Sequence, residues 1–487
     1  MIAADRRRDA LEALALARPP LEAVTEPERL AAFEMDAYIQ KRERPLAAAL
    51  PDDERQVASL VAECARRGVP VVSRGAGTGI SGGALPDPEG ILLVLTRLRS
   101  LHRLDPLARL AQVGPGMPNA RVTEQAAPAG LYFAPDPSSQ TVSSIGGNVA
   151  ENAGGVHCLK YGLTVHNVMG VRLVDGEGDV LELGGEALDA PGYDLLALAC
   201  GSEGNLGVVT RATLKLLPRP EATHTILAAF ATVKAGAEAV GRIIGAGVVP
   251  AALEMMDRVV IDACERYMAL GLPAAEALLL VEVDGGREEA LEERGRIEAL
   301  LVASGATEVR VAATEAERAG LWKARKGAFA ALATVLPDYY TMDGTIPRRA
   351  LPEVLDAIYA LGREYGLVIG NVFHAGDGNI HPCIFYDAAK AGELERSEEL
   401  GGKILELCID HGGTITGEHG VGLEKLRQMC LQFRDGEIAA FHAVKAAFDP
   451  AGILNPGKAV PTLKRCAEWG GMHVRGGRVP RPDIPRF

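Results

Sequence analysis

The stretch that constrains the fold most is residues 69–83, VPVVSRGAGTGISGG, in which a short apolar run ends and five glycines follow. Glycine lets the backbone adopt positive φ and turn successive N–H groups toward one point, which suits a bound pyrophosphate. Residues 77–82 also match GxGxxG, but a Rossmann fold requires a helix directly after the loop. Here two prolines and a strand-like run at residues 91–95 follow instead. The sequence therefore predicts a dinucleotide loop outside a Rossmann fold.

Two further glycine-rich stretches lie beside strand-like runs: residues 135–155, PDPSSQTVSSIGGNVAENAGG, and residues 201–210, GSEGNLGVVT. A single loop of this kind is most often only a turn, which is the simpler interpretation of the first stretch taken alone. Three such loops exceed what a tight turn requires, whereas a flat, extended cofactor approached by backbone from several sides requires them. The sequence thus predicts a cofactor held by three backbone loops.

The composition is that of a globular protein and excludes several classes of function. The chain of 487 residues, 48% hydrophobic and 24% charged, is long enough for two or three domains. Its net charge of −13 disfavours nucleic acid and an anionic membrane surface as partners. No apolar run reaches the ~18–20 residues of a membrane span, and the N-terminus lacks the apolar core of a signal peptide. We therefore expect a cytoplasmic protein that reaches a membrane only through a partner.

The pattern of helices and strands changes near residue 220. Helical periodicity is predicted for residues 1–40, and short strands alternate with turns up to the linker signal Pro218-Arg219-Pro220. Strand, helix and strand patterns then occur twice in succession, which is typical of a ferredoxin-like split sheet. We therefore expect an α+β protein with four parts. These are an N-terminal helical segment (1–40), a two-part cofactor-binding domain (41–220), a ferredoxin-like cap and substrate domain (221–425), and a C-terminal helical segment with a docking tail (426–487).

Two histidines flank a predicted hairpin in the sequence HAGDGNIH, residues 374–381. Asp377-Gly378 is a strong signal for a two-residue turn, and such a turn would pair His374 with His381. Directly opposed residues have Cβ atoms ~4.5–5.5 Å apart on one face, which is close enough for two imidazoles to share a divalent metal ion. Two satisfied core histidines are the simpler alternative.

A third candidate ligand comes from TITGEHGVG, residues 414–422, which is predicted to be a strand running into Glu418-His419. The glycines on either side allow close approach of the backbone. Two histidines and one glutamate with an open position suit a catalytic divalent ion such as zinc or manganese. The sequence thus predicts that Glu418 joins His374 and His381 as a metal ligand, which leaves His419 as a candidate base.

Together with four longer stretches, these motifs resemble the family of FAD-linked 2-hydroxyacid dehydrogenases, which includes D-lactate and D-2-hydroxyglutarate dehydrogenases. The family has an FAD-binding domain of the vanillyl-alcohol-oxidase type. The likeness covers nearly the whole chain and is strongest to the branch formed by the flavin subunits of bacterial glycolate oxidases. The four stretches are long and specific: residues 153–163 (AGGVHCLKYGL), 337–347 (PDYYTMDGTIP), 401–408 (GGKILELC) and 461–468 (PTLKRCAE).

The resemblance implies roles for residues of this sequence, position by position. Arg325, on a helix predicted over residues 315–334, would hold the substrate carboxylate, and His419 would be the catalytic base. The first two loops would bind the FAD pyrophosphate and ribityl chain, the third would lie along the flavin, and Asn455 would lie near the isoalloxazine ring. The implied metal ligands are His374, His381 and Glu418. The implied FAD-binding residues are Arg74, Gly75, Ala76, Gly77, Thr78, Gly79, Pro135, Asp136, Ser138, Thr141, Gly146, Gly147, Asn148, Asn152, Gly154, Gly155, Gly201, Glu203, Gly204, Gly207, Val208, Val209 and Asn455.

The implied reaction is the two-electron oxidation of glycolate or a similar small 2-hydroxy acid. The metal would lower the pKa of the substrate hydroxyl, His419 would accept its proton, and a hydride would pass to flavin N5. The eight cysteines form no CxxC pair, which excludes an iron–sulfur centre in this chain. The resemblance therefore implies an outside electron acceptor, with an iron–sulfur subunit and a second, flavin-type subunit as partners. Cys158 is expected to pack rather than to bind the flavin covalently.

Three positions depart from the family pattern. Asn205 replaces a threonine beside the flavin, Cys383 replaces an asparagine that contacts a second carboxylate in some relatives, and Thr341 stands in the place of a substrate-contacting lysine. The small thiol favours a short monocarboxylate as substrate. The remaining alternatives are a D-lactate or other 2-hydroxyacid dehydrogenase, a true oxidase that uses oxygen, and a non-catalytic flavin-binding subunit.

Overall fold

The computed structural model describes residues 2–187 and 191–462. These residues form two compact units: unit 1 contains segments 2–154, 163–218 and 419–462, and unit 2 contains segments 155–162 and 219–418. The last crossing of the chain between the units is the peptide bond from Glu418 to His419. The expected docking tail lies outside the described residues from position 463 onward.

Unit 1 holds the glycine-rich loops and two main sheets. Its helices and strands are α1 (Ile2–Leu16), β1 (Glu22–Val24), α2 (Pro27–Leu30), η1 (Ala31–Phe33), β2 (Ala47–Leu50), α3 (Glu54–Arg67), β3 (Val71–Arg74), β4 (Ile91–Val94), β5 (Leu101–Asp105), β6 (Leu110–Val113), α4 (Asn119–Ala126), η2 (Ala127–Ala129), β7 (Leu131–Tyr132), α5 (Ile145–Glu151), α7 (Thr164–Asn167), β8 (Val168–Val174), β9 (Val180–Gly184), α8 (Leu195–Ala199), β10 (Val208–Lys215), β11 (Leu217–Pro218), α16 (Leu426–Gln432) and α17 (Asp435–Phe448).

The first sheet of unit 1 has the parallel strands β2, β4 and β3, with β1 antiparallel at its edge. Helix α3 begins with a capping box, in which the side chains of Asp53 and Gln56 each accept the other's backbone N–H. It ends at Gly68, whose φ of +62° lies in the left-handed region. The buried residues of α3 recur at helical spacing and pack with α1 on this sheet.

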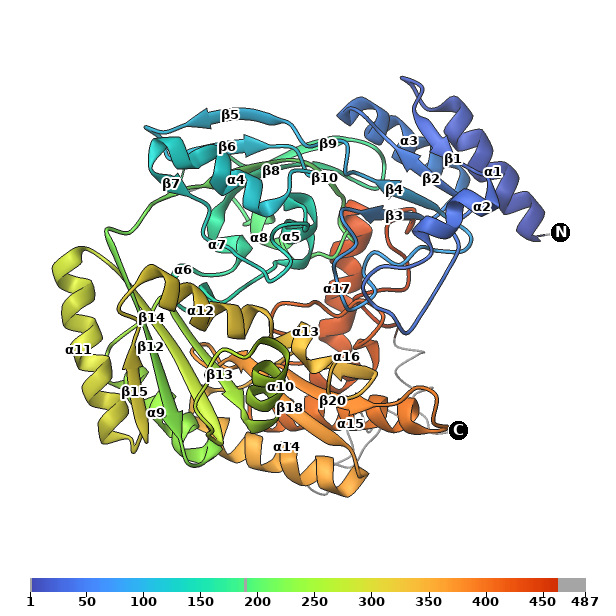
Figure 1. Cartoon of the computed structure of the whole chain (residues 1–487). Helices are drawn as coiled ribbons and strands as arrows, with labels where there is room; N and C mark the ends of the chain where they lie inside the picture. Colours follow the sequence, from blue (N-terminus) through green and yellow to red (C-terminus); the bar gives the residue numbers. More distant parts are fainter. Residues whose placement is uncertain (1, 188–190, 463–487) are drawn as a thin grey trace. The chain divides into compact units, whose positions relative to one another are not determined.

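The second sheet of unit 1 is antiparallel, with the strand order β5-β6-β10-β8-β9. Strands β8 and β9 form a hairpin and pair in register from Gly170–Gly184 to Val174–Val180. Figure 1 shows α4, α5 and α8 gathered beside this sheet, and their apolar residues share one core with it. The two sheets agree with the two-part domain expected for this part of the chain.

Unit 2 is built on one large sheet. Its helices and strands are α6 (Cys158–Tyr161), β12 (Ala222–Phe230), α9 (Val233–Gly245), β13 (Ala252–Asp257), α10 (Arg258–Met268), β14 (Ala277–Gly285), α11 (Arg287–Ala303), β15 (Glu308–Val311), α12 (Glu315–Lys326), α13 (Ala328–Leu332), β16 (Asp338–Thr341), β17 (Gly344–Thr345), η3 (Arg348–Ala350), α14 (Leu351–Tyr365), β18 (Val368–His374), β19 (Asn379–Ile380), β20 (Pro382–Tyr386) and α15 (Glu393–Asp410).

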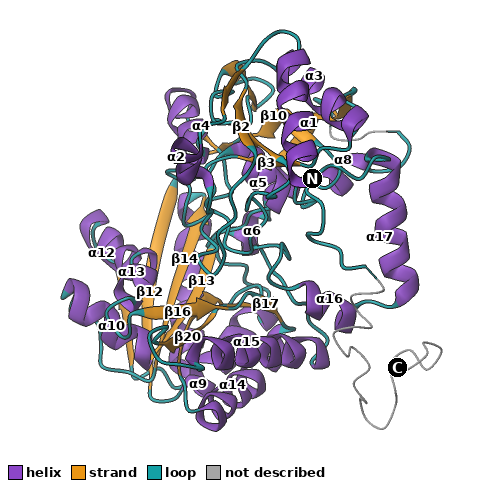
Figure 2. Ribbon diagram, turned by 90° about the vertical axis from the view of Figure 1, so that its right-hand side faces the viewer, coloured by secondary structure: helices purple, strands orange, loops and turns teal. Residues whose placement is uncertain are grey.

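The ferredoxin-like arrangement is confirmed in unit 2. Its strands follow the order β15-β12-β14-β13 and pair antiparallel, and α9 and α11 lie together beside β12 (Figure 1). Figure 2 shows β12, β13 and β14 as long neighbouring strands. The opposite face of the sheet packs against α10, α12 and α13, because alternate residues such as Ala252, Met256 and Leu280 share a core with these helices. Glu254, midway between Ala252 and Met256, points to the same face.

Three local expectations are wrong. Only Ile2–Leu16 forms the long N-terminal helix, because Pro19-Pro20 follow and the chain then adds β1 to the first sheet. The helix predicted over residues 315–334 is interrupted at Gly327, where α12 ends and α13 begins. The segment 414–422 is not a strand: it makes a single bridge at Thr414, and carboxylates described below hold the rest of its backbone.

Within the two described stretches of the chain, none of the helices combines the length and the hydropathy that a membrane-spanning helix requires.

Candidate functional site

The three glycine-rich loops of unit 1 converge at the C-terminal end of β3. A Cβ atom on Gly75, in the first loop, would lie 2.0 Å from the Oγ of Ser144, which caps α5 in the second loop. A Cβ atom on Gly204, in the third loop, would lie 2.7 Å from the Oγ of Ser73 on β3. Glycine is therefore required at both positions for the backbones to come this close. By contrast, a Cβ atom on Gly79 would meet nothing within 4 Å.

Three residues expected to bind the cofactor have an unusual backbone conformation. Asn152, Glu203 and Asn455 have φ values of 53°, 51° and 42°, in the left-handed region that residues other than glycine rarely adopt. Such conformations cost free energy and cluster at functional sites. The structure thus marks one residue from the second loop, one from the third and the predicted flavin neighbour.

Asn455 ties the loops of unit 1 together and leaves one polar atom unused. Its backbone N–H donates to Val71 O, and its Nδ2 donates to the carbonyl oxygens of Gly83 and Glu203. Its Oδ1 accepts no hydrogen bond from a described residue, the Nδ2 of Asn148 donates none, and the Oγ of Ser143 has no hydrogen-bond partner; all three atoms are buried. Because an unpaired buried polar atom is costly, the loops suit a bound group that supplies hydrogen-bond partners. This chemistry fits FAD.

Glu203 has a second role within unit 1. Its buried carboxylate accepts the backbone N–H groups of Val421 at 2.8 Å and Gly422 at 2.6 Å. Burial raises the pKa of Glu203. The Oγ of Ser81 donates to the carbonyl oxygen of His419. The backbone around His419 is therefore held by two side chains, and not by a sheet.

The three predicted metal ligands belong to unit 2, and their donor atoms all lie within 4.8 Å of one another. The Oε1 of Glu418 is 3.1 Å from the Nε2 of His374 and 3.5 Å from the Nε2 of His381. The two imidazole rings meet edge to face, with centroids 5.2 Å apart. Two imidazoles and one carboxylate at these separations fit a small divalent cation such as zinc or manganese.

The hairpin predicted to bring the histidines together has a different register. His374 pairs with Asn379, and not with His381, so four residues separate β18 from β19. The turn is longer because the Asp377 carboxylate accepts the N–H of Asn379 and the N–H of Gly378 donates to His374 O. His381 lies between β19 and β20, and its ring still reaches that of His374.

Glu254 is a functional candidate that the sequence analysis missed. It lies directly opposite His374 on the neighbouring strand and is only 1% exposed. Its Oε1 is 2.8 Å from the Nδ1 of His374. Its Oε2 accepts a hydrogen bond from the Nε of Arg325 and forms an ion pair with Nη2 of the same guanidinium, both at 2.7 Å. Burial alone would raise the pKa of Glu254, but the imidazole and the guanidinium hold it below its ordinary value. Burial would lower the pKa of His374, yet Glu254 and Glu418 raise it.

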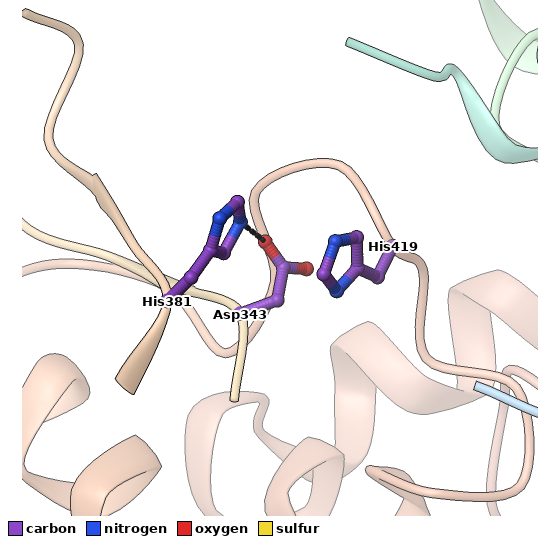
Figure 3. Close-up of side chains that lie close together, drawn as sticks. All are labelled: Asp343, His381 and His419. Atoms are coloured by element: carbon purple, nitrogen blue, oxygen red, sulfur yellow. Dashed lines mark ion pairs between the residues drawn. The ribbon is translucent and has the colours of Figure 1, made fainter. Parts of the chain in front are cut away.

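Asp343 is a second residue that the sequence analysis missed. Its fully buried carboxylate accepts the backbone N–H groups of Gly417 and Glu418 and the hydroxyl of Thr416. Figure 3 shows the His381 ring with its Nε2 turned toward this carboxylate, at 3.5 Å. Asp343 thus fixes the backbone of one metal-ligand candidate and faces the ring of another. His419, which Figure 3 also labels, begins the last segment of unit 1.

Arg325 is buried, and Glu254 is its hydrogen-bond partner. No described residue forms a hydrogen bond with its Nη1. Two of the three departures from the family pattern lie together in the same unit, because Thr341 on β16 is opposite Cys383 on β20. Their Oγ1 and Sγ atoms are 3.4 Å apart, and burial raises the pKa of the Cys383 thiol to about 12.

Comparison with known proteins adds two family matches. A profile described as "FAD binding domain" matches residues 45–184, and one described as "FAD linked oxidases, C-terminal domain" matches residues 219–459. Among solved structures, p-cresol methylhydroxylase with substrate bound superposes with a TM-score of 0.79 at 15% identity, over 95% of this chain and 98% of that one. The structural likeness confirms the expected α+β fold with an FAD-binding domain of the vanillyl-alcohol-oxidase type.

Several curated proteins are similar over nearly their whole length. The glycolate oxidase subunit GlcD of Escherichia coli K12 is 54% identical over 482 residues, which is 99% of this chain and 97% of that protein. The protein of the same name from Bacillus subtilis 168 is 39% identical, over 88% of this chain and 91% of its own length. A D-lactate dehydrogenase of Archaeoglobus fulgidus is 32% identical, over 85% of this chain and 91% of its own length.

Proposed function

This chain belongs to the FAD-linked 2-hydroxyacid dehydrogenase family and is an FAD-dependent oxidoreductase, and on that premise we propose that it oxidises glycolate to glyoxylate. The observation that supports the proposal is the cluster of two buried histidines, His374 and His381, with the partly buried Glu418, joined through Glu254 to Arg325. A subunit that only bound flavin would not require this cluster. The full-length identity to glycolate oxidase subunits favours glycolate within the family.

In this proposal, unit 1 binds FAD through the three loops, with Asn455 near the isoalloxazine ring. When bound, FAD supplies the acceptor for the two electrons that leave the α-carbon of the substrate. The backbone N–H groups of the loops suit the pyrophosphate, and the unused polar atoms of Ser143, Asn148 and Asn455 are available to the remainder of the cofactor.

Unit 2 then binds the substrate. Arg325 pairs with the carboxylate, and Glu254 orients its guanidinium by holding Nε and Nη2. His374, His381 and Glu418 would hold a divalent cation, zinc or manganese, which would supply the positive charge that favours loss of a hydroxyl proton. His419 accepts that proton as a general base. Its backbone is held by Ser81 at its own carbonyl oxygen and by Glu203 at the N–H groups two and three residues later, as a positioned base requires.

The substrate is a small monocarboxylate. The side chains of Thr341 and Cys383 form a hydrogen bond with each other. They stand where the family pattern has a substrate-contacting lysine and an asparagine that contacts a second carboxylate. Neither side chain offers a positive charge or an amide to a second carboxylate, so a dicarboxylate would leave one charge without a partner.

Electrons leave through a partner. The sequence has no iron–sulfur motif, so we propose that a separate iron–sulfur subunit and a second, flavin-type subunit complete a glycolate oxidase complex in the cytoplasm. The subunit names of the relatives support a complex, since both glycolate oxidase relatives are named as single subunits.

D-Lactate is the second candidate substrate, because a D-lactate dehydrogenase is similar over most of its length. Anaerobic titration of the FAD-loaded chain with glycolate, D-lactate and L-lactate, read as loss of flavin absorbance, distinguishes the candidates. Glycolate is expected to reduce the flavin fastest. Preferential reduction by D-lactate would move the assignment to the second candidate, and reduction by none of the three would contradict the family chemistry. Turnover with oxygen as fast as with an artificial acceptor would instead indicate a true oxidase.

A further inference from the structure

The carboxylate of Glu254 in unit 2 contacts both His374, a proposed metal ligand, and Arg325, the proposed partner of the substrate carboxylate. Glu254 directs Oε1 to the Nδ1 of His374 and Oε2 to the Nε and Nη2 of Arg325. The three side chains come from β13, β18 and α12 and are all buried. Because each oxygen has its own partner, neither contact can be lost without leaving part of a buried charge unpaired.

The contact with His374 selects the form of the ring that binds metal. When the Oε1 of Glu254 accepts the Nδ1 proton, the lone pair of His374 lies on Nε2, the nitrogen that faces Glu418 at 3.1 Å. Carboxylates that hold the far nitrogen of a ligating histidine fix its tautomer and orientation and raise its affinity for metal.

The contact with Arg325 fixes which edge of the guanidinium remains available. Nε donates a hydrogen bond to Oε2 and Nη2 forms an ion pair with the same oxygen, whereas Nη1 has neither kind of partner among the described residues. Charge-assisted hydrogen bonds in a low-dielectric interior polarise one another. A change in the hydrogen bond at one oxygen of Glu254 therefore alters the strength of the contact at the other oxygen.

We propose that Glu254 is a positioning residue that couples the metal-binding imidazole of His374 to the substrate-binding guanidinium of Arg325. Filling either site then strengthens the other, and by thermodynamic linkage the effect is the same in both directions. This inference rests on the proposed function, since it takes the metal and carboxylate roles of the two partners from it.

A matched control lies on the adjacent strand. Glu282 on β14 is also a buried carboxylate between a histidine and an arginine, at 3.3 Å from the Nε2 of His157 and 3.2 Å from the Nη1 of Arg318. Neither partner belongs to the metal cluster. Glu282→Gln therefore makes the same chemical change at an equivalent place in the fold, without touching His374 or Arg325.

The test is a substrate-free zinc titration of the full chain loaded with FAD, against a chromophoric chelator. Glu254→Gln is expected to weaken Zn²⁺ binding about 10- to 100-fold, the usual effect of removing such a partner, while Glu282→Gln stays within about twofold of wild type. Arg325→Lys keeps the charge but not the planar guanidinium that places both Nε and Nη2 against Oε2, and is expected to weaken Zn²⁺ binding on the order of threefold to tenfold. In the Glu254→Gln background, Arg325→Lys is expected to have no further effect.

The outcomes separate this inference from the function on which it rests. Normal Zn²⁺ affinity in Glu254→Gln, or an Arg325→Lys effect that persists in full when Glu254 is absent, overturns the coupling alone. A wild-type chain that binds neither Zn²⁺ nor Mn²⁺ overturns the metal site and the coupling together. If Glu254→Gln does not retain FAD, Glu254→Asp replaces it, because the shorter side chain keeps the charge but cannot reach both partners, and the same loss of affinity is expected.

Discussion

Two buried glutamates of unit 2 have the same kinds of partner but different surroundings. Glu254 and Glu282 lie on adjacent strands, and each holds one histidine and one arginine. Around Glu282 every group is used locally, since the carboxylate also accepts from Thr225 and Trp322, and Arg318 also pairs with Glu315. Around Glu254 the outer ends of both partners are left for something else: His374 extends to Glu418, and Arg325 keeps Nη1.

The difference separates an ion-pair network that holds the fold from one that presents reactive groups. Hydrogen bonds from His157, Thr225 and Trp322 lower the pKa of Glu282 to about 2 despite its burial, as expected for a carboxylate whose bonds are all satisfied. In the Glu254 set, the outer nitrogen of His374 faces Glu418, another candidate metal ligand, and Nη1 of Arg325 has no hydrogen-bond partner among the described residues. A buried histidine–glutamate–arginine set therefore does not identify a site by itself, and what the outer nitrogens of its partners face distinguishes the two sets.

The largest effect is expected from replacing His374, with His157 as the matched control. His374→Ala should lose both the metal and all measurable flavin reduction while keeping FAD, because a site without one ligand loses affinity and geometry together. His157→Ala should keep its metal, because His157 contacts Glu282 outside the cluster. Metal analysis and flavin content of the two proteins provide the measurement. Full metal content in His374→Ala would show that the ion-pair set around Glu254, like that around Glu282, has only a structural role.

The second-largest effect is expected from replacing His419, the proposed acceptor of the substrate hydroxyl proton. His419→Ala should retain FAD and metal but reduce its flavin ~10²–10⁴-fold more slowly, which is the usual contribution of a positioned base. Stopped-flow measurement of flavin absorbance with glycolate gives the rate. Reduction at the wild-type rate would show that the proton leaves by another route.

The two arginines provide a smaller contrast. Arg325→Lys keeps the charge but loses the planar fork, and loss of one charge-assisted bond is worth ~1.5–3 kcal/mol, or roughly ten- to hundredfold in KM. Arg318→Lys should leave KM within about threefold, because the ion-pair partners of Arg318 among the described residues are Glu282 and Glu315, which are not metal-ligand candidates. Steady-state kinetics with an artificial acceptor compare the two. Equal effects of the two substitutions on KM would contradict the proposed difference between the ion-pair sets around Glu254 and Glu282.

The smallest effect is on stability and depends on pH. The pKa of Glu282 is depressed from 4.5 to about 2 in the folded state, so its contribution of about 3 kcal/mol is present above pH ~5 and is lost as pH falls toward 2. Glu282→Gln should therefore have a lower Tm than wild type at pH 6, and the gap should narrow toward pH 3. Thermal unfolding followed by circular dichroism at several pH values tests this, and a gap independent of pH would contradict the role of this ion pair.

The sequence predicted best what depends on backbone geometry. The glycine positions marked the three loops, because the close approaches at Gly75 and Gly204 admit no side chain. The ferredoxin-like sheet followed from alternating helix and strand periods. The cluster of Glu418 with the two histidines was predicted as a candidate metal site because these residues lie in short glycine-flanked motifs, and the structure places their donor atoms within 4.8 Å of one another.

The sequence analysis missed what depends on partners far along the chain. Glu254 meets His374 across 120 positions and Arg325 across 71, and only the strand register brings them together. The single available signal was a charged residue within the apolar run AALEMM, since a buried charge requires a partner. The hairpin register was predicted wrongly for a related reason. The Asp377 carboxylate accepts a hydrogen bond from the backbone N–H of Asn379 within its own turn, and the dipeptide Asp377-Gly378 alone does not predict this contact.

Transfer of a hydride from a small 2-hydroxy acid to FAD is tested most directly by rapid anaerobic mixing of the FAD-loaded chain with glycolate, and in parallel with glycolate deuterated at the α-carbon. We expect loss of the oxidised flavin absorbance in both reactions. The deuterated substrate should react clearly more slowly, because its C–D bond must break. A flavin that stays oxidised with glycolate and with both lactate enantiomers would contradict it.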